Sequence, residues 1–324
     1  MSSRLTSSAL LGLALALAAF GCTYDRSRDD DGGEGEGEGE GEGEGEGEDA
    51  GASPEPQDVR LVDWNVHDLF DTAADPGTDD PVPAEDDLAA KLAAIGAVLR
   101  ELDPDVVALQ EVEHESLLER LVEDELGGAY DQIAFVEAND PRGIDVGLVA
   151  RLPITDVVSH LDERFPGVDG TGNYGWSRDA LEVHLDVAGR DLVMLVNHLI
   201  SKSDPENDDK RAAQARHARA IAEGLVAASP LVLVAVVGDM NDLPGSPTLE
   251  ALLGDGVLVD SSAELPEGES WTFVENGRRE RIDYVTLLPA LSAMQTGVLT
   301  AHEDPVDDAS DHEPVVVDFH VTPP

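Results

Sequence analysis

The chain has 324 residues and carries 69 acidic against 20 basic residues, which gives a formal net charge of −49 at pH 7. Such a surface repels polyanions and argues against broad electrostatic adhesion to nucleic acid, although it does not exclude a nuclease whose site is screened by a metal ion. Hydrophobic residues make up 41% of the chain, enough to bury a core, and the single cysteine, Cys22, excludes an internal disulfide.

Residues 1–22 are predicted to be a signal peptide. Arg4 precedes an apolar run, 9–20, that is too short to span a membrane. The segment Leu17-Ala18-Ala19-Phe20-Gly21-Cys22 resembles a bacterial lipoprotein signal, which implies that Cys22 becomes the lipidated first residue. We therefore expect a membrane-anchored lipoprotein of the cell envelope, periplasmic or surface-exposed, with plain secretion as the alternative.

Residues 23–58 are predicted to be an acidic tether. Gly and Glu alternate from 33 to 48, which leaves no apolar residue to bury and makes like charges repel one another. The tether is expected to be extended and disordered and to hold the following domain, 59–324, away from a membrane surface.

The first half of this domain alternates strands and helices. Apolar runs predict strands at 59–66, 105–111, 130–136, 144–150 and 154–160. Apolar residues at helical spacing predict helices at 86–101 and 117–126. Between the first strand and the first helix, residues 72–83 are rich in Asp and Pro and are expected to be irregular.

The second half is richer in strands. The segment 180–187 alternates cleanly and predicts a strand with one wet face, and strands follow at 191–200, 231–238, 282–287 and 313–320, with helices at 207–228 and 246–253. Frequent hairpins, with helices between several strands, favour an α/β (α+β) domain of two antiparallel or mixed sheets with helices outside them.

Several of these strands share one design, an apolar run that ends in polar residues. The clearest is Leu231–Asp242, in which seven apolar residues lead to a carboxylate and an amide two positions apart. The corresponding polar residues elsewhere are Asn65, Gln110-Glu111, Asn197-His198, Asp283 and Asp311-His312. One polar terminus is good turn chemistry, but six suggest a single site at a common sheet edge.

The residue types indicate the chemistry. Oxygen donors without a Cys or His cluster suit Mg²⁺ or Mn²⁺ better than zinc, and Ca²⁺ is a further possibility. His198 and His312 are able to carry protons near neutral pH, and Arg178 offers a fork for a phosphate oxygen. Together these are the parts of a metal-assisted phosphate ester hydrolase.

The order of these segments resembles the endonuclease/exonuclease/phosphatase superfamily, with its DNase I-like fold. The segments are Trp64-Asn65-Val66, Leu109-Gln110-Glu111-Val112, Asn197-His198-Leu199, Gly238-Asp239-Met240-Asn241-Asp242, Arg281-Ile282-Asp283-Tyr284 and Ser310-Asp311-His312-Glu313-Pro314-Val315. The resemblance covers roughly 59–319, and each segment is weak alone. It implies a four-layer αββα sandwich with two central sheets flanked by helices.

The resemblance also implies a role for each site residue. Glu111 would be the main metal ligand beside Asn65, with Asp311 as a further ligand or a link in the network around His312. Asp239 would orient or deprotonate the attacking water. The remaining implied roles are phosphate binding by Asn241, Arg178 and His312, support of His312 by Asp283, assistance to the leaving group by His198, and orientation of His198 by Asp145.

Three functions compete at this stage. The first is a divalent-metal phosphodiesterase, most simply an endonuclease acting on nucleic acid. The second is a phosphatase or a phospholipase C-like or sphingomyelinase-like hydrolase of small or lipid phosphoesters, which the acidic surface mildly favours. The third is a binding module without activity, which the intact set of acidic residues and histidines argues against. A monomer is expected.

Residues outside this set are assigned structural or surface roles. They are His67, His114, His160, His184, His217, His302 and His320. Trp176 and Tyr174, in the Gly-rich loop before Arg178, are open between substrate stacking and core packing.

Overall fold

Two mixed β-sheets of six strands each form the framework of the computed structural model, which describes residues 54–324 except 139 and 303. The predicted signal peptide and nearly all of the predicted tether lie outside the described residues. Within the described part, no helix combines the length and apolar character needed to cross a membrane.

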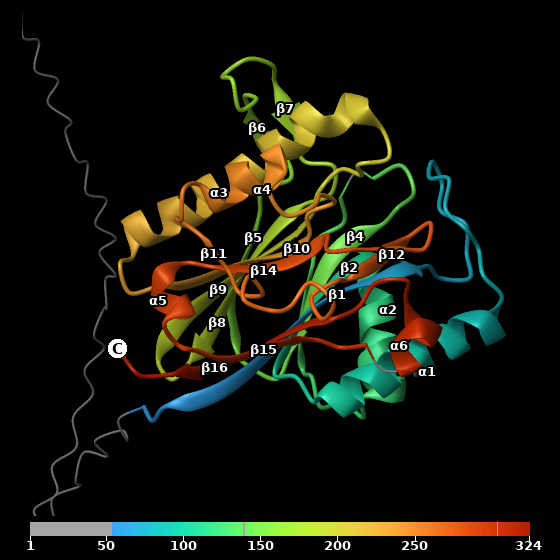
Figure 1. The fold of residues 1–324 in the computed structure, drawn as a ribbon. Coiled ribbons are helices and arrows are strands. Elements are labelled where there is room, and N and C mark those ends of the chain that lie inside the picture. The colour runs from blue at the N-terminus through green and yellow to red at the C-terminus, as the bar shows by residue number, and fades with distance from the viewer. Residues whose placement is uncertain (1–53, 139, 303) are drawn as a thin grey trace, which may run out of the picture. The chain divides into compact units, whose positions relative to one another are not determined.

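The first sheet has the strand order β15-β16-β1-β2-β4-β3. Its strands are β15 (Gln295–Thr300), β16 (Val315–Val321), β1 (Gln57–Leu69), β2 (Val106–Val112), β4 (Asp145–Ala150) and β3 (Gln132–Phe135). Helices α1 (Glu85–Leu102), α2 (Glu115–Arg120) and α6 (Asp304–Ala309) cover its outer face, and one turn of π-helix (Leu121–Glu125) follows α2 (Figure 1).

The second sheet has the order β11-β14-β10-β9-β8-β5. Its strands are β11 (Val259–Asp260), β14 (Asp283–Leu287), β10 (Leu233–Asp239), β9 (Arg190–His198), β8 (Ala180–Val187) and β5 (Ile154–Ser159). Helices α3 (Asp208–Ala228), preceded by a 3₁₀ turn (Pro205–Asn207), and α4 (Pro247–Leu253) lie over its outer face, and α5 (Pro289–Ser292) follows β14 (Figure 1).

The central strands of both sheets, such as β2 and β10, are buried on both faces, which explains the continuous apolar runs in the sequence. Along β2, Val106 and Ala108 pack between the sheets, whereas Val107 and Leu109 pack against the helices of the first sheet. A third cluster fills the space between the second sheet and α3 and α4. The four-layer αββα sandwich expected from the sequence is therefore confirmed.

Two crossover units bring the polar strand ends together. β1 and β2 run parallel and are joined through α1, and β9 and β10 run parallel and are joined through α3. Parallel neighbours end at the same sheet edge, so each unit delivers the polar ends of two strands to one place.

Gly238 allows β10 to approach β9 just before Asp239. It has φ of 128°, and a Cβ at this position would lie 1.8 Å from the carbonyl oxygen of Asn197. Only glycine fits this combination of backbone angle and space.

The expectation of a wet face on β8 holds only at the end of the strand, where Asp186 is exposed and His184 is half-buried. Glu182 is only 6% exposed, because its carboxylate is paired with two histidines, His160 at 3.0 Å and His184 at 2.9 Å. Polar and apolar residues do alternate along the strand, but polar side chains rather than water are the partners of the Glu182 carboxylate.

Several small elements were not predicted from the sequence. They are the edge strand β15, helix α6, strand β11 and two hairpins, β6 (Arg164–Phe165) with β7 (Tyr174–Gly175) and β12 (Phe273–Glu275) with β13 (Arg278–Glu280). Most of these strands have two or three residues, too few to establish a periodic pattern.

Candidate active site

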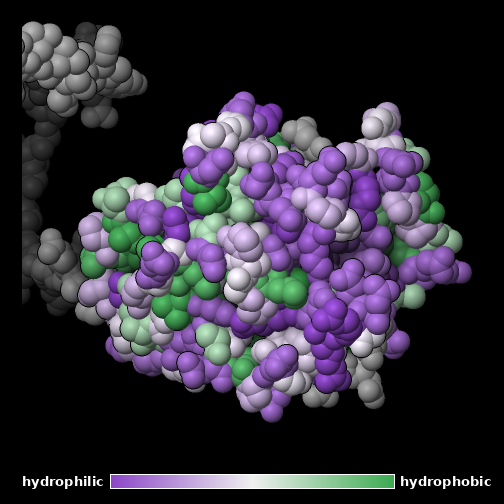
Figure 2. Space-filling model, turned by 45° about the horizontal axis from the view of Figure 1, so that its top comes forward, coloured by the Kyte–Doolittle hydropathy of each residue, from purple (hydrophilic) through white to green (hydrophobic). Residues whose placement is uncertain are grey.

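A cleft of about 230 Å³ opens at the sheet edge where β1, β2, β9 and β10 end. Its lining residues are His67, Glu111, Arg142, Arg178, His198, Ser201, Lys202, Ser203, Asp239, Asn241, Phe273, Glu275, Ile282, Asp311 and His312. In the space-filling view, the visible face is largely hydrophilic, with hydrophobic residues in small scattered groups (Figure 2). The residues predicted from six separate segments therefore meet around one cleft.

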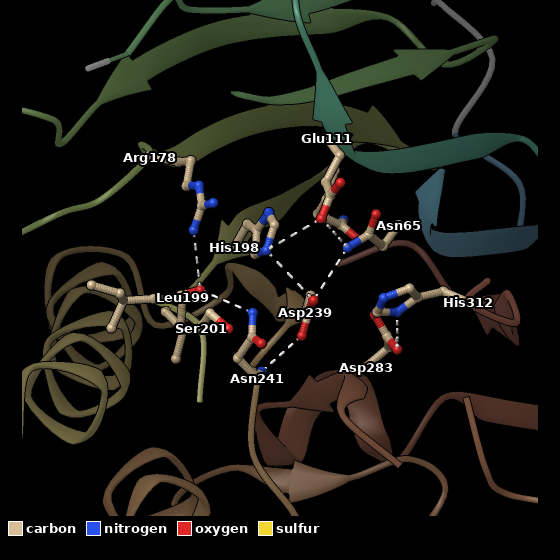
Figure 3. Close-up of polar contacts among 12 residues, drawn as sticks. Asn65, Glu111, Arg178, His198, Leu199, Ser201, Asp239, Asn241, Asp283 and His312 are labelled. Carbon is tan, nitrogen blue, oxygen red and sulfur yellow. Dashed lines mark hydrogen bonds and ion pairs between the residues drawn. The ribbon is translucent and has the colours of Figure 1, made fainter. Parts of the chain in front are cut away.

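Asn65 connects the two sheets at the floor of the site (Figure 3). Its Nδ2 lies 3.2 Å from Glu111 Oε1 and also 3.2 Å from Asp239 Oδ2. Its own Oδ1 accepts a hydrogen bond from the backbone N–H of His67. In this orientation, Asn65 holds two carboxylates together through its N–H groups, whereas the sequence predicted a metal ligand.

The backbone at the site is held in an unusual conformation. Positive φ angles are found at His67 (52°), Asp68 (52°), Glu111 (64°) and Asn241 (53°). Non-glycine residues rarely adopt such angles, and they persist where surrounding contacts impose them. Here they turn the ends of β1, β2 and β10 so that their side chains face the cleft.

Asp239 is buried and fixed from two sides. Its Oδ1 accepts a hydrogen bond of 2.7 Å from the backbone N–H of Asn241, and Asn65 reaches its Oδ2. The Nδ2 of Asn241 donates to the carbonyl oxygen of Leu199, at 3.1 Å. Together these contacts hold the side chains of Asp239 and Asn241 in defined orientations at the wall of the cleft.

His312 faces this wall from the loop before β16. Its Nδ1 lies 2.9 Å from Asp283 Oδ2, and the backbone N–H of Asp283 donates a hydrogen bond to Thr272 Oγ1 at 3.1 Å. The indole N–H of Trp64 donates to the carbonyl oxygen of His312. The ring of Phe273 packs against the imidazole, with centroids 4.7 Å apart.

His198 lies between the two central carboxylates. Its Nε2 is 3.5 Å from Asp239 Oδ2 and 3.9 Å from Glu111 Oε1. The predicted contact with Asp145 is not formed: among the described residues His198 Nδ1 has no hydrogen-bond partner, and Asp145 Oδ2 instead accepts from the N–H of Ala138. Asp145 occurs at the start of β4, where its carboxylate orders the neighbouring loop.

Each basic side chain of the cleft has an acidic partner. Arg178 Nε lies 2.9 Å from Asp140 Oδ2, and Arg142 lies 2.9 Å from Asp68 Oδ1. Lys202 is paired with Glu280 and also lies over the ring of Phe273. The further contact of Arg178, a long hydrogen bond of 3.4 Å to the carbonyl of Leu199, keeps its guanidinium close to Asn241 (Figure 3).

The electrostatics separate the two central carboxylates. Burial raises the pKa of Asp239 to about 7, with Asp283 adding to the effect. Burial also acts to raise the pKa of Glu111, but His198, Arg142 and two hydrogen-bond donors outweigh it and hold the pKa below the ordinary value. Glu111 therefore stays ionised, while Asp239 is poised to exchange a proton near neutral pH.

The two histidines differ in the same way. Burial lowers the pKa of His198 well below its ordinary value, and the positive charge of Arg178 adds to this. For His312, burial acts to lower the pKa, but the carboxylate of Asp283 prevails and raises it to about 10. His198 is neutral and His312 is charged at pH 7.

The donor set at Glu111 fits a divalent cation. One ligand atom from each of His67, Asp68 and Glu111 lies within 4.8 Å of the others. Asp311, predicted as a ligand, approaches this group through His67, with Oδ1 3.1 Å from Nδ1. Carboxylate oxygens that dominate such a set suit a hard cation.

Sequence reasoning missed several residues that line the cleft or pair with its arginines. They are His67, Asp68, Asp140, Arg142, Lys202 and Phe273. The sequence assigned His67 a surface role, although it follows Asn65 by two residues at a strand end, which was the available signal. Asp140, Arg142 and Lys202 belong to loops, and Asp68 and Phe273 lie at the ends of strands β1 and β12, where no periodicity indicates the direction of a side chain.

Trp176 belongs to the core rather than to the cleft. It is 9% exposed and packs edge-on against Phe165, with ring centroids 5.2 Å apart. This resolves the alternative that the sequence left open, and Tyr174 packs against the same cluster.

Comparisons with known proteins agree with this architecture. A family model described as the Endonuclease/Exonuclease/phosphatase family matches residues 61–264. No curated protein matches the chain.

Solved structures resemble the chain at low sequence identity. An endonuclease/exonuclease/phosphatase from Bacteroides vulgatus has a TM-score of 0.59 and 18% identity, over 82% of this chain and 99% of the other. The human Nocturnin catalytic domain with bound sulfate has 0.58 and 17%, over 82% and 95%. TDP2 of D. rerio complexed with a single strand DNA product has 0.57 and 18%, over 82% and 99%. At this identity, the similarity shows the fold.

Proposed function

The chain belongs to the Endonuclease/Exonuclease/phosphatase family, and from this premise we propose that it is a divalent-metal-dependent phosphodiesterase of the nuclease type. The observation that carries the proposal is the meeting of Glu111, Asp239 and His312 around one cleft. An anionic ligand, a candidate base and a charged imidazole are the groups that hydrolysis of a phosphate ester requires.

Glu111, with His67 and Asp68 beside it, would hold Mg²⁺ or Mn²⁺. When bound, such a cation would neutralise negative charge that develops on the phosphate oxygens. The carboxylate of Glu111 is already oriented for this purpose by Asn65 Nδ2 and by the backbone N–H of Asp68 at 3.0 Å.

Asp239 is the proposed base. Its raised pKa lets it accept a proton from water, whose oxygen then attacks phosphorus while the bond to the leaving oxygen breaks. Because the N–H of Asn241 holds Oδ1 and Asn65 approaches Oδ2, the carboxylate cannot rotate away from the cleft. This fixed geometry lowers the entropic cost of reaching the transition state.

His312 and Asn241 are the proposed phosphate-binding groups. A charged His312 offers Nε2–H to a non-bridging oxygen while Asp283 retains Nδ1. His198 is neutral, so it acts as a hydrogen-bond donor to the leaving oxygen or to Asp239 rather than as a strong acid. That reading modifies the role that the sequence alone suggested for His198.

Nucleic acid is the first proposed substrate. The support is by analogy: TDP2 of D. rerio has this fold and has been solved with a single strand DNA product. The support is limited to the fold, because the identity is 18%.

A small or lipid phosphoester is the second candidate, and a specific observation favours it. Arg142, Arg178 and Lys202 are each paired with a carboxylate, and the chain carries a formal net charge of −49. A polyanion is bound through several unpaired cations that displace its counterions, and these cleft residues do not supply them.

A substrate panel distinguishes the alternatives. The purified protein is incubated with plasmid DNA, RNA, bis-p-nitrophenyl phosphate and sphingomyelin, with Mg²⁺ or with EDTA. Plasmid nicking or RNA cleavage that EDTA stops supports the nuclease, and turnover confined to sphingomyelin or to the small diester supports the second candidate. Absence of turnover on all four would refute both and favour a binding module without activity.

We also propose that the protein is attached to the cell envelope through a lipid on Cys22, as the N-terminal sequence suggests. Labelling of growing cells with a radioactive fatty acid tests this. The wild-type chain should carry label and sediment with membranes, and Cys22→Ser should lose both properties. An unlabelled wild-type chain in the medium would instead indicate plain secretion.

A further inference from the structure

A second group of metal-ligating side chains lies where the loop that follows β1 meets the two residues between β2 and α2. The sequence marks residues 72–83 as irregular and rich in Asp and Pro, and the proposed reaction uses none of them. In the structure, the backbone N–H of Asp71 donates to Glu113 Oε2 at 2.6 Å, and the N–H of Asp79 donates to the carbonyl of Pro141 at 2.9 Å. The loop is therefore fastened to two segments beside the cleft.

Three residues there have the geometry of a metal site. One ligand atom from each of Asp71, Glu113 and His114 lies within 4.8 Å of the others. Two carboxylates and an imidazole on a single cation are a common donor set for divalent metals.

Glu113 supplies an independent observation that points to a ligand. Glu113 is only 1% exposed, and among the described residues no N–H or O–H group donates to its Oε1, since the N–H of Asp71 engages Oε2 alone. The carboxylate of Asp80 lies within reach of Glu113 and brings a second acceptor rather than a donor. A buried carboxylate oxygen without a donor is costly unless a cation meets it. The charges of Asp71 and Asp80 lie close enough to act on Glu113 and make this requirement stronger.

The basic side chains of the described residues do not compensate this charge. No Lys or Arg forms an ion pair with Asp71, Asp75, Asp80 or Glu113 in the described part of the chain. Only His114 is close, with Nε2 3.0 Å from Asp75 and Nδ1 3.1 Å from Glu137. Both of these partners are accessible to solvent, so either can give way when a ring nitrogen binds a metal.

We propose that Asp71, Glu113 and His114 form a second metal site, separate from the cleft, for a divalent cation of the Zn²⁺ or Mn²⁺ class. The imidazole favours these cations over Ca²⁺ and Mg²⁺, which prefer oxygen ligands alone. The site does not share its ligands with the cleft: the oxygens of Glu111 contact Asn65 and the N–H of Asp68, whereas Glu113 contacts Asp71.

The site has a structural consequence for the cleft. The loop that it fastens also binds Pro141, and the adjacent Arg142 faces Asp68 and lies 3.9 Å from Glu111. A cation held by Asp71, Glu113 and His114 stabilises this loop and, through it, the turn that carries Arg142.

Metal binding tests the proposal without reference to turnover. The whole chain is stripped of metal in a Glu111→Gln background, which removes the main ligand of the cleft, and is titrated with ZnCl₂, MnCl₂ and CaCl₂ by calorimetry. We expect one tight site for Zn²⁺ or Mn²⁺. Asp71→Asn and His114→Gln, made in the same background, should each weaken it at least tenfold.

Asp79→Asn is the matched control, because Asp79 is an exposed residue of the same loop and, within the described part of the chain, makes only a backbone hydrogen bond. It should bind these metals as the Glu111→Gln parent does. Every variant carries the same acidic tether, so weak metal binding to the tether cancels in these comparisons. Circular dichroism identifies any variant that fails to fold. Asp71 and His114 are chosen for substitution because they are less buried than Glu113 and their replacement disturbs the fold less.

The proposal is overturned if the Glu111→Gln parent shows no tight site for either transition metal, or if Asp71→Asn and His114→Gln bind as well as Asp79→Asn. Tight binding of Ca²⁺ that His114→Gln leaves unchanged would also overturn it, since the imidazole would then not be a ligand. Failure of the proposed phosphodiesterase activity leaves these measurements unaffected, so the two proposals fail separately.

Discussion

The Nδ1 atom of His312 lies 2.9 Å from Oδ2 of Asp283, and both side chains are almost completely buried. The pair joins the loop before β16, in the first sheet, to β14, in the second. It fixes the ring so that Nε2 faces the cleft, and it keeps the imidazole charged. The contribution of this pair to catalysis is directly measurable.

Asp283→Asn should lower kcat by about 10²- to 10⁴-fold, because the imidazole loses both its charge and its fixed tautomer. The measurement is steady-state hydrolysis of bis-p-nitrophenyl phosphate with Mg²⁺. His312→Gln should have a similar effect, and the double variant should be little worse than either single one, since the residues act as a unit. Strictly additive losses would contradict this coupling.

Glu111→Gln should abolish most Mg²⁺-dependent activity, a loss of about 10²- to 10³-fold, since a preorganised electrostatic group is removed. The wild-type protein should also gain thermal stability on addition of Mg²⁺, because a ligand that binds only the folded state stabilises it. Scanning calorimetry with and without Mg²⁺ should show a shift in Tm for the wild type and none for Glu111→Gln. An equal shift in both would place the Mg²⁺ elsewhere.

The contacts of His160 with Glu163 and with Glu182 of β8 should make stability depend on pH. Burial acts to lower the pKa of His160, but Glu182 and Glu163 raise it to about 9. A raised folded-state pKa contributes stability that is complete below the unfolded value, about 6.5, and that disappears as the pH rises through 9.

His160→Gln should therefore destabilise the protein by on the order of 1–3 kcal/mol at pH 6 and by much less above pH 9.5. Urea unfolding at both values measures the difference. His320→Gln is the control, since His320 and its partner Asp58 are both exposed. A constant difference between wild type and His160→Gln across this range would show that the charge of His160 contributes nothing.

Gly238→Ala should destabilise the fold by more than about 3 kcal/mol, because the added Cβ would collide with the backbone of β9 at a φ that alanine avoids. Gly224→Ala is the matched control. Gly224 lies within α3 with open space around it, so alanine there should be neutral or stabilise by about 0.5–1 kcal/mol. Equal unfolding midpoints in urea would refute the close-approach explanation.

The sequence predicted the elements that have a strong pattern. The runs that became β2 and β10 are apolar on both faces, and the spacing that predicted a helix at 86–101 corresponds to α1, Glu85–Leu102. The meeting of Glu111, Asp239 and His312 followed from their positions at strand ends. Hydrophobic patterns of this kind reflect whether each side chain faces solvent or a neighbouring layer, so they can be recognised from the sequence alone.

The remainder depends on contacts between distant segments. Arg142 and Lys202 are loop residues whose direction is set by partners far away in the sequence, so no local pattern revealed them. Asp145 was assigned to His198, but the N–H of Ala138 takes its carboxylate. A wet face on β8 was expected because the sequence does not reveal which polar side chains will cover Glu182.

The place of β16 in the first sheet has a consequence for how activity is acquired. This last strand inserts between β15 and β1, and His312 immediately precedes it. A chain that is still emerging from the ribosome has Glu111 and Asp239 but lacks the imidazole that completes the cleft. The cleft is therefore complete only after the residues up to β16 have been synthesised and β16 has docked beside β1, and a shorter nascent chain lacks His312.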